Sequence, residues 1–169
     1  MNEFGQRIAA VRAHPGASDL LAAFARDVMA EGYRVHGLVQ HPRQRPDGGL
    51  GLVVEDLESG RCYDISQNLG PGSESCNVDP RGLAEASVVL RRAIAMGAEL
   101  VVVSRFGKLE ASGHGLAAEM LEVMVAGIPL LTVVDDRNMG AWNVLTGGSG
   151  LILEADAHRL RLWWQAFAP

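Results

Sequence analysis

Short apolar runs rich in β-branched residues alternate along this chain with amphipathic stretches of helical spacing. Such alternation predicts strands that lie parallel in one sheet, with helices covering both of its faces. The most informative run is Leu100–Val103, which leads directly into the charged, glycine-containing segment 104–115. Because ligands bind at the carboxyl edge of an open α/β sheet, we expect a site in that segment.

Periodicity and capping signals place the other elements. Strands are expected at 7–11, 35–40, 100–103, 129–134 and 151–153, and helices at about 18–31, 79–96, 115–126, 139–145 and 155–167. Residues 41–49 are expected to form a loop, 50–55 and 61–65 an antiparallel hairpin, and 66–78 a long polar loop. The chain, residues 1–169, is thus predicted to be a single α/β domain, a three-layer sandwich with a mainly parallel sheet and one antiparallel hairpin.

Composition excludes several classes of protein. Of 169 residues, 48% are hydrophobic and 21% are charged, which is enough for a substantial core. The net charge is −5, and acidic and basic residues are interspersed rather than grouped in blocks. This pattern argues against a nucleic-acid binder, which usually has a basic face. No apolar run approaches the roughly 20 residues of a membrane span, and residues 1–6 lack the pattern of a signal peptide. With only Cys62 and Cys76, we expect a cytoplasmic protein with no disulfide framework and no membrane partner.

The segment after Leu100–Val103 has the properties of an anion site. Arg105 and Lys108 supply positive charge, and glycines such as Gly107 and Gly115 allow backbone N–H groups to approach a ligand. The helix expected from about Gly115 would direct its positive end toward the same place.

A second stretch, 66–77, adds hydroxyl and amide donors, and many well-aimed hydrogen bonds are what oxyanions require. We expect a small oxyanion or phosphate-bearing ligand, such as molybdate, phosphate or a nucleotide, to bind between the two loops. The candidate ligand-binding residues are His14, Gln40, Ser66, Gln67, Ser75, Cys76, Arg105, Gly107, Lys108, Glu110, His114 and Gly115.

Each candidate also has a structural interpretation. Arg105 and Lys108 could pair with Glu110 and Glu119 in a solvated salt-bridge cluster. Glu110 could be a general base, a metal ligand or a partner that orients the neighbouring cations. Cys76 could be a thiolate ligand, a nucleophile or a small buried hydrophobe, and the two histidines could be structural.

No histidine or cysteine spacing indicates a zinc site, so we expect no metal and no cofactor. Trp142, Trp163 and Trp164 could support self-association, which makes a homodimer a prediction to test. Adjacent residues of a helix point in different directions, so one of Trp163 and Trp164 is expected to face outward.

Four separated motifs follow one another in order: Gly37–Gln40, Ile65–Gly70, Ser75–Pro80 and Arg105–Glu110. Together they resemble the bacterial family called domain of unknown function 2478, over almost the whole chain. The resemblance implies a P-loop-like α/β fold and a tendency to be encoded near molybdate-transport and molybdoenzyme genes.

The layout is also similar to small P-loop nucleoside-triphosphatases, with informative departures. Ser18 and Asp19 stand where that class has its second loop glycine and its lysine, and Ser104 and Arg105 replace its strand-end acids. An aspartate in place of the lysine repels phosphate, and the lost acids remove the usual magnesium ligands. Asp135 and its neighbour on the next strand end leave open a replacement metal site.

We therefore expect binding of a small anion without hydrolysis, with a link to molybdate handling that rests on the family resemblance. One alternative is a nucleotide hydrolase or phosphotransferase that uses Glu110, His114 and Asp135 in a non-standard site. Another is a regulatory interaction protein with a vestigial pocket.

Overall fold

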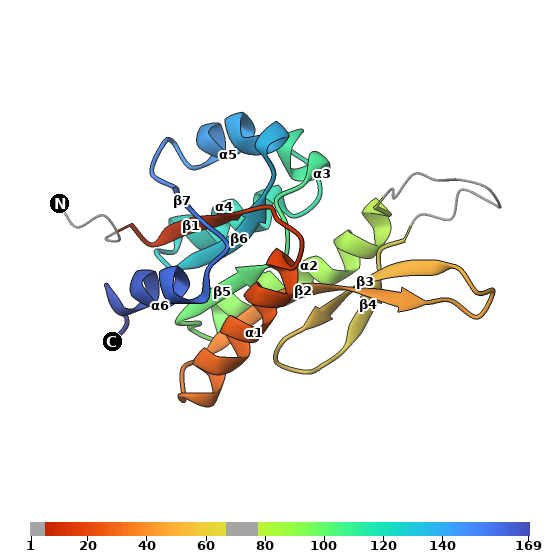
Figure 1. Ribbon diagram of the computed structural model, residues 1–169, viewed down its shortest axis with the longest axis horizontal. Coiled ribbons are helices and arrows are strands. Elements are labelled where there is room, and N and C mark those ends of the chain that lie inside the picture. Colours follow the sequence, from red (N-terminus) through yellow and green to blue (C-terminus); the bar gives the residue numbers. More distant parts are fainter. Residues whose placement is uncertain (1–5, 67–77) are drawn as a thin grey trace.

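The computed structural model describes residues 6–66 and 78–169, and its centre is a seven-stranded sheet of order β4-β3-β2-β5-β6-β1-β7 (Figure 1). The strands are β1 (Ile8–Arg12), β2 (Val35–Gln44), β3 (Leu50–Asp56), β4 (Cys62–Asp64), β5 (Leu100–Val103), β6 (Leu130–Val134) and β7 (Leu151–Leu153). The helices are α1 (Ala17–Ala30), α2 (Pro80–Ala95), α3 (Lys108–Ala111), α4 (Ala117–Val125), α5 (Met139–Leu145) and α6 (Ala157–Gln165), with a short 3₁₀ helix η1 (Asp136–Asn138).

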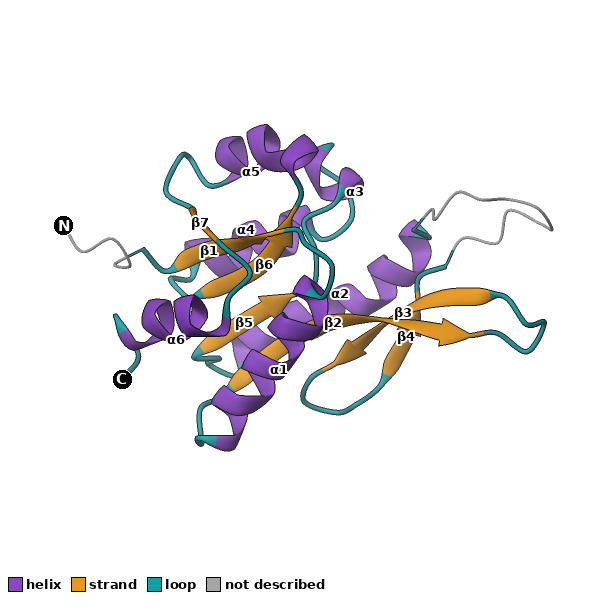
Figure 2. Cartoon of the chain, in the orientation of Figure 1, coloured by secondary structure: helices purple, strands orange, loops and turns teal. Residues whose placement is uncertain are grey.

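Two apolar clusters, one on each face of the sheet, make up the core. Figure 2 shows the helices that cover the sheet on both sides. The side chains of α1 and α6 pack on one face, and those of α2, α4 and α5 on the other. This arrangement confirms the predicted three-layer α/β architecture. No helix within residues 6–66 and 78–169 is both long enough and apolar enough to cross a membrane.

The antiparallel part of the sheet is larger than the sequence indicated. β3 and β4 form the expected hairpin, but β2 continues through Gln44 and pairs with β3 along 38–44, so the loop expected from residue 41 was wrong for its first four residues. Figure 1 shows this antiparallel extension projecting beyond the parallel strands. The extension forms a wall beside the carboxyl ends of β5 and β6.

The expectation that one of the adjacent tryptophans faces outward was wrong. Trp163 and Trp164 are both buried, with 0% and 2% of their surface exposed. The indole Nε1 of Trp163 donates to the Gln6 carbonyl at 2.8 Å, and Trp164 makes edge contacts with Tyr33 and Phe167. Residues 100° apart on a helix can share a wide apolar face, so neither indole is available for self-association.

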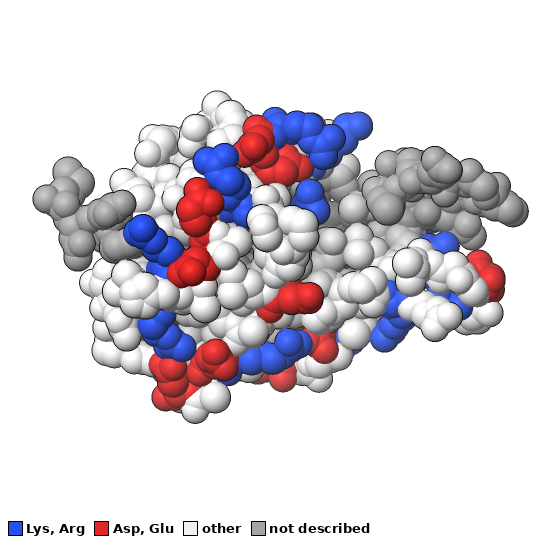
Figure 3. Space-filling view, viewed as in Figure 1, with Lys and Arg blue, Asp and Glu red and all other residues white. Residues whose placement is uncertain are grey.

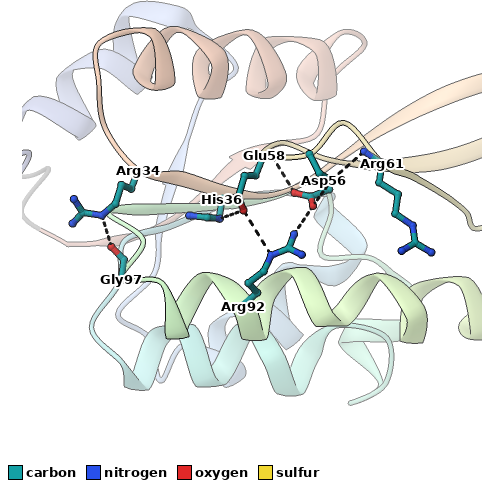
Figure 4. A network of polar contacts seen from close by, with 8 residues as sticks. Arg34, His36, Asp56, Glu58, Arg61, Arg92 and Gly97 are labelled. Atoms are coloured by element: carbon teal, nitrogen blue, oxygen red, sulfur yellow. Dashed lines mark hydrogen bonds and ion pairs between the residues drawn. The ribbon is translucent and has the colours of Figure 1, made fainter.

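A polar network fixes the β3–β4 turn to α2 (Figure 4). The Arg92 guanidinium donates from Nη2 to Asp56 Oδ2 at 2.5 Å, and its Nε lies 3.7 Å from Glu58 Oε2. Buried His36 on β2 places Nδ1 3.1 Å from the same Glu58 oxygen. The Asp56 carboxylate also accepts from Ser59 Oγ at 2.7 Å and from the Glu58 N–H at 3.0 Å.

Burial by itself would raise the pKa of Asp56, but these hydrogen bonds outweigh it. The hydroxyl of Ser59, the N–H of Glu58 and the Arg92 guanidinium together lower the pKa below its ordinary value of 3.8. The folded state therefore holds Asp56 ionised more strongly than the unfolded chain does. Its contribution to stability is present above pH 3.8 and is lost as the pH falls through the lower folded pKa.

We expect Asp56→Asn to lower the free energy of unfolding at pH 7 by about 1–3 kcal/mol, because an amide cannot accept all three hydrogen bonds. The difference from wild type should shrink at pH 3, where protonation begins to weaken the native carboxylate. Urea unfolding at the two pH values measures both effects. Asp27→Asn, an exposed carboxylate on α1, is the control, and an equal loss in the two variants would contradict the network's role.

Candidate functional site

A cavity of about 890 Å³, the edge cavity, lies at the carboxyl ends of β5 and β6, between the β2–β3 wall and α3. Its described polar lining residues are Gln40, Ser104, Arg105, Gly107, Lys108, Glu110, Ser112, Asp135, Arg137 and Asn138. Its described apolar lining residues are Leu52, Val54, Ile65, Val78, Pro80, Leu83, Leu109 and Leu116. The charged lining residues all follow β5 and β6, and we call them the charged side. Six apolar residues come from β3, from the end of β4 and from the start of α2, namely Leu52, Val54, Ile65, Val78, Pro80 and Leu83, and we call them the apolar side.

Three cations of the described lining belong to the charged side. Arg105 comes two residues after β5, Lys108 opens α3, and Arg137 lies in η1 after β6. Parallel strands end at the same edge of the sheet, which is why segments so far apart in sequence converge here. Figure 3 shows that basic and acidic side chains are interspersed on the visible face, so the convergence is local and not part of a broad basic surface.

Asp135 holds two of these cations. Its Oδ2 lies 3.3 Å from Arg105 Nη2 and 3.5 Å from Arg137 Nη2, while its Oδ1 accepts from the Asn138 N–H at 3.0 Å. The salt-bridge interpretation of Arg105 therefore needs correction, because its acidic partner is Asp135 and not Glu110 or Glu119. Lys108 forms no ion pair with any residue in the described ranges.

Glu110 is buried and its carboxylate accepts hydrogen bonds from backbone groups. Oε2 accepts from the Gly107 N–H at 3.0 Å and Oε1 from the Leu116 N–H at 3.3 Å. The N–H at the start of α4, which was expected to face a ligand, is thus directed to a side chain of the protein itself. Glu110 closes the segment 107–116 into a compact loop that presents Lys108 to the cavity.

The Glu110 carboxyl is held in a largely desolvated place. Burial raises its pKa, and the backbone hydrogen bonds together with the nearby positive charge of Arg105 offset this only in part. Gly115 packs directly against it in a left-handed conformation with φ +58°, and a Cβ there would stand 2.4 Å from Glu110 Oε1. The glycine at position 115, a candidate ligand-binding residue, is thus explained by the structure itself, because only glycine leaves room for the Glu110 carboxylate.

The edge cavity gathers five of the candidate residues, Gln40, Arg105, Gly107, Lys108 and Glu110. Other candidates lie elsewhere. Ser66 Oγ bonds both the N–H and the carbonyl of Leu52, His14 Nδ1 lies 2.7 Å from the Pro15 carbonyl, and His114 is exposed outside the described lining.

Gln67, Ser75 and Cys76 lie outside the described residues. The described residues on either side, Ile65 and Val78, both line the edge cavity. The described residues on both sides of the second predicted loop therefore line the same cavity as Arg105.

Several lining residues were not among the candidates. Arg137 and Asn138 follow β6 as Arg105 follows β5, so the strand-end rule could have found them. The apolar residues Leu52 and Val54 could not have been found in that way. They reach the cavity because β2 continues past residue 40 and carries β3 with it.

The region that corresponds to a P-loop lies apart from this cavity. Gly16 caps α1 in a left-handed conformation with φ 88°, no residue of 13–19 belongs to the described lining, and Asp19 occupies the first turn of the helix. Asp136, considered as part of a replacement metal site, is paired with Arg12 at 2.9 Å. Within the described ranges, no group of three or more histidine, cysteine, aspartate or glutamate side chains is arranged to hold a metal ion.

The fold matches that of a solved nucleoside triphosphatase. A human cancer-related nucleoside triphosphatase, solved in solution, superimposes with a TM-score of 0.67 at 17% identity, over 94% of each chain. At this identity the likeness shows the fold alone, and it confirms the predicted fold class.

Sequence comparison defines the family. The model of the family described as Protein of unknown function (DUF2478) matches residues 8–163, and the chain belongs to this family, as its four motifs predicted. The chain is also 40% identical, over 164 residues, to the Molybdenum import ATP-binding protein ModC 2 of Bradyrhizobium diazoefficiens. That match takes in 94% of this chain but 18% of the relative, so the chain spans about a fifth of the relative's length.

We expect Gly115→Ala to destabilise the protein by about 2–4 kcal/mol, since the added methyl meets Glu110 in addition to straining the backbone. Gly113→Ala is the matched control, because Gly113 also has a positive φ, +85°, but open space around it. Chemical unfolding of both variants measures the difference. In a Glu110→Ala background the two glycine substitutions should become similar, and a persistent difference would contradict the contact.

Proposed function

We propose that this chain binds a small oxyanion or a phosphate-bearing ligand in the edge cavity, without hydrolysing it. The observation that supports this most directly is the balance of charge on one side of that cavity. Among the described lining residues, three cations, Arg105, Lys108 and Arg137, face two carboxylates, and both carboxylates already accept hydrogen bonds from the protein. A net positive charge with unused donors is what an anion needs.

Asp135 orients both arginines but engages only part of each guanidinium group. Each uses a single guanidinium nitrogen on Asp135, at 3.3 and 3.5 Å, and the Arg105 and Arg137 side chains are 43% and 88% exposed. Exposed ion pairs of this kind are worth about 0–1 kcal/mol, so an incoming anion can recruit the remaining donors at little cost. Asp135 then acts as an orienting group for the arginines.

Binding without hydrolysis agrees with the state of the acidic groups. Glu110 is engaged by two backbone N–H groups, and Asp135 by two arginines and the Asn138 N–H. Asp19 lies where P-loop enzymes carry the lysine that neutralises phosphate charge. These features support a binding role over the alternative of a hydrolase built on Glu110, His114 and Asp135.

The similarity to a protein named for molybdenum import supports molybdate as one ligand to test. Titration calorimetry with molybdate, tungstate, sulfate, phosphate and ATP covers the proposed ligand class. For any anion that binds, Arg105→Gln and Lys108→Gln should each weaken affinity about tenfold, the effect of one charge-assisted hydrogen bond. Arg159→Gln, an exposed arginine on α6, is the control and should change nothing.

Two results would contradict this proposal. Absence of heat with every anion would remove the binding role, and magnesium-dependent phosphate release from ATP would favour the hydrolase. Circular dichroism of the Arg105 and Lys108 variants separates loss of binding from loss of folding.

A regulatory interaction is a second candidate function, favoured by one observation. The chain corresponds to 18% of the relative named as an ATP-binding protein, so a unit of this kind occurs joined to a much longer polypeptide. Light scattering of this chain mixed with a purified molybdenum-import ATP-binding protein tests it, and two unassociated species at micromolar concentration would contradict it.

A further inference from the structure

We propose that the ligand of the edge cavity is an amphipathic organic phosphate, with its anionic group at Arg105 and Lys108 and a flat heterocyclic ring on the β2–β3 wall. This inference rests on the proposed anion-binding function and narrows it. It assigns Gln40 and Leu52 as residues that determine specificity.

The size of the cavity exceeds what a simple oxyanion needs. Its volume of about 890 Å³ falls in the upper part of the range of small-molecule sites, roughly 300–1,000 Å³. A tetrahedral oxyanion has five heavy atoms, and it fills at most about 150 Å³ if each takes the roughly 30 Å³ of a liquid water. Most of the cavity would lie beyond the reach of such an ion.

The apolar side of the cavity offers accessible surface. Leu52 and Val78 are half-buried beside the core residues Val54, Ile65 and Leu83, and Pro80 at the start of α2 is exposed. Their side chains come from the antiparallel wall and from the first turns of α2. This surface would gain nothing from a hydrated ion but gains hydrophobic free energy when it covers a ring.

Gln40 stands between the two sides. On β2 it is paired with Val54 of β3, and the next pair on the same face joins Pro42 to Leu52, so Gln40, Val54 and Leu52 lie side by side. Two residues earlier on β2, the Leu38 carbonyl accepts the N–H of Ser104, which places the end of β5 and Arg105 next to Gln40.

The Gln40 amide makes no hydrogen bond to any part of the chain that the structure describes. An amide offers one acceptor and two donors, which match the mixed hydrogen-bonding edge of a heterocyclic base. Its position suits it to contact the edge of a ring that lies on Leu52 while a phosphate reaches Arg105.

Chemical labelling of Lys108 reports directly on ligand binding, because Lys108 is the only lysine of the 169 residues. Acylation of its amine by an N-hydroxysuccinimide ester, followed by peptide mass spectrometry, reports whether the cationic side is covered. The probes are inorganic phosphate, ribose 5-phosphate and the adenosine, guanosine and flavin mononucleotides, with calorimetry as the second measurement.

We expect at least one mononucleotide to protect Lys108 at concentrations about tenfold below those of ribose 5-phosphate, since burial of a ring adds affinity that the phosphate alone lacks. Leu52→Ala and Gln40→Leu should each weaken that mononucleotide about fivefold or more, and leave the affinity for inorganic phosphate unchanged. Leu50→Ala is the matched control, because Leu50 lies on the same strand and face as Leu52 but is 80% exposed outside the cavity lining.

The possible results separate the two proposals. If ribose 5-phosphate and every mononucleotide protect Lys108 equally and Leu52→Ala affects neither, the ring site is overturned and anion binding stands. If no probe protects Lys108 or gives heat, both proposals fail. Because Leu52→Ala can loosen the hairpin, Gln40→Leu provides a second variant, and thermal unfolding of both confirms that they are folded.

Discussion

The buried carboxylate of Glu110 organises the part of the molecule on which the candidate site depends. It accepts the N–H groups of Gly107 and Leu116 and so draws together the two ends of the loop after β5. Gly115 leaves the space that this carboxylate occupies. An internal anion thus takes up two backbone donors of the loop, so the external anion that we propose would be left to the side chains of Arg105, Lys108 and Arg137. The proposed site is therefore built from side chains and not from a backbone nest.

Much of the fold follows from local signals in the sequence. Asp79 accepts the Arg81 N–H and Pro80 takes the first helical position, so α2 begins where its capping residues predicted. The strand β5 and the helix α5 also occupy the predicted residues. In these elements the hydrophobic pattern and the capping residues indicate the same structure, so tertiary packing does not change the local preference.

The extension of β2 could not be predicted in the same way. Pro42 and two nearby arginines suggested a loop, because proline cannot donate to a central strand. Beyond Leu38, however, β2 has passed the end of β5, and among the described residues it is paired only on its β3 side. The missing N–H of Pro42 therefore faces an open edge, where it costs nothing. The apolar half of the edge cavity depends on this long-range arrangement, and α3, at four residues, is too short for periodicity to reveal.

The two ends of the sheet have a consequence for how the molecule behaves at high concentration. The outermost strands, β4 and β7, are each three residues long. An incoming strand from another chain finds only a few unpaired backbone groups at either border, too few to continue the ladder. At these two borders, the shortness of the strands itself opposes edge-to-edge pairing with another chain.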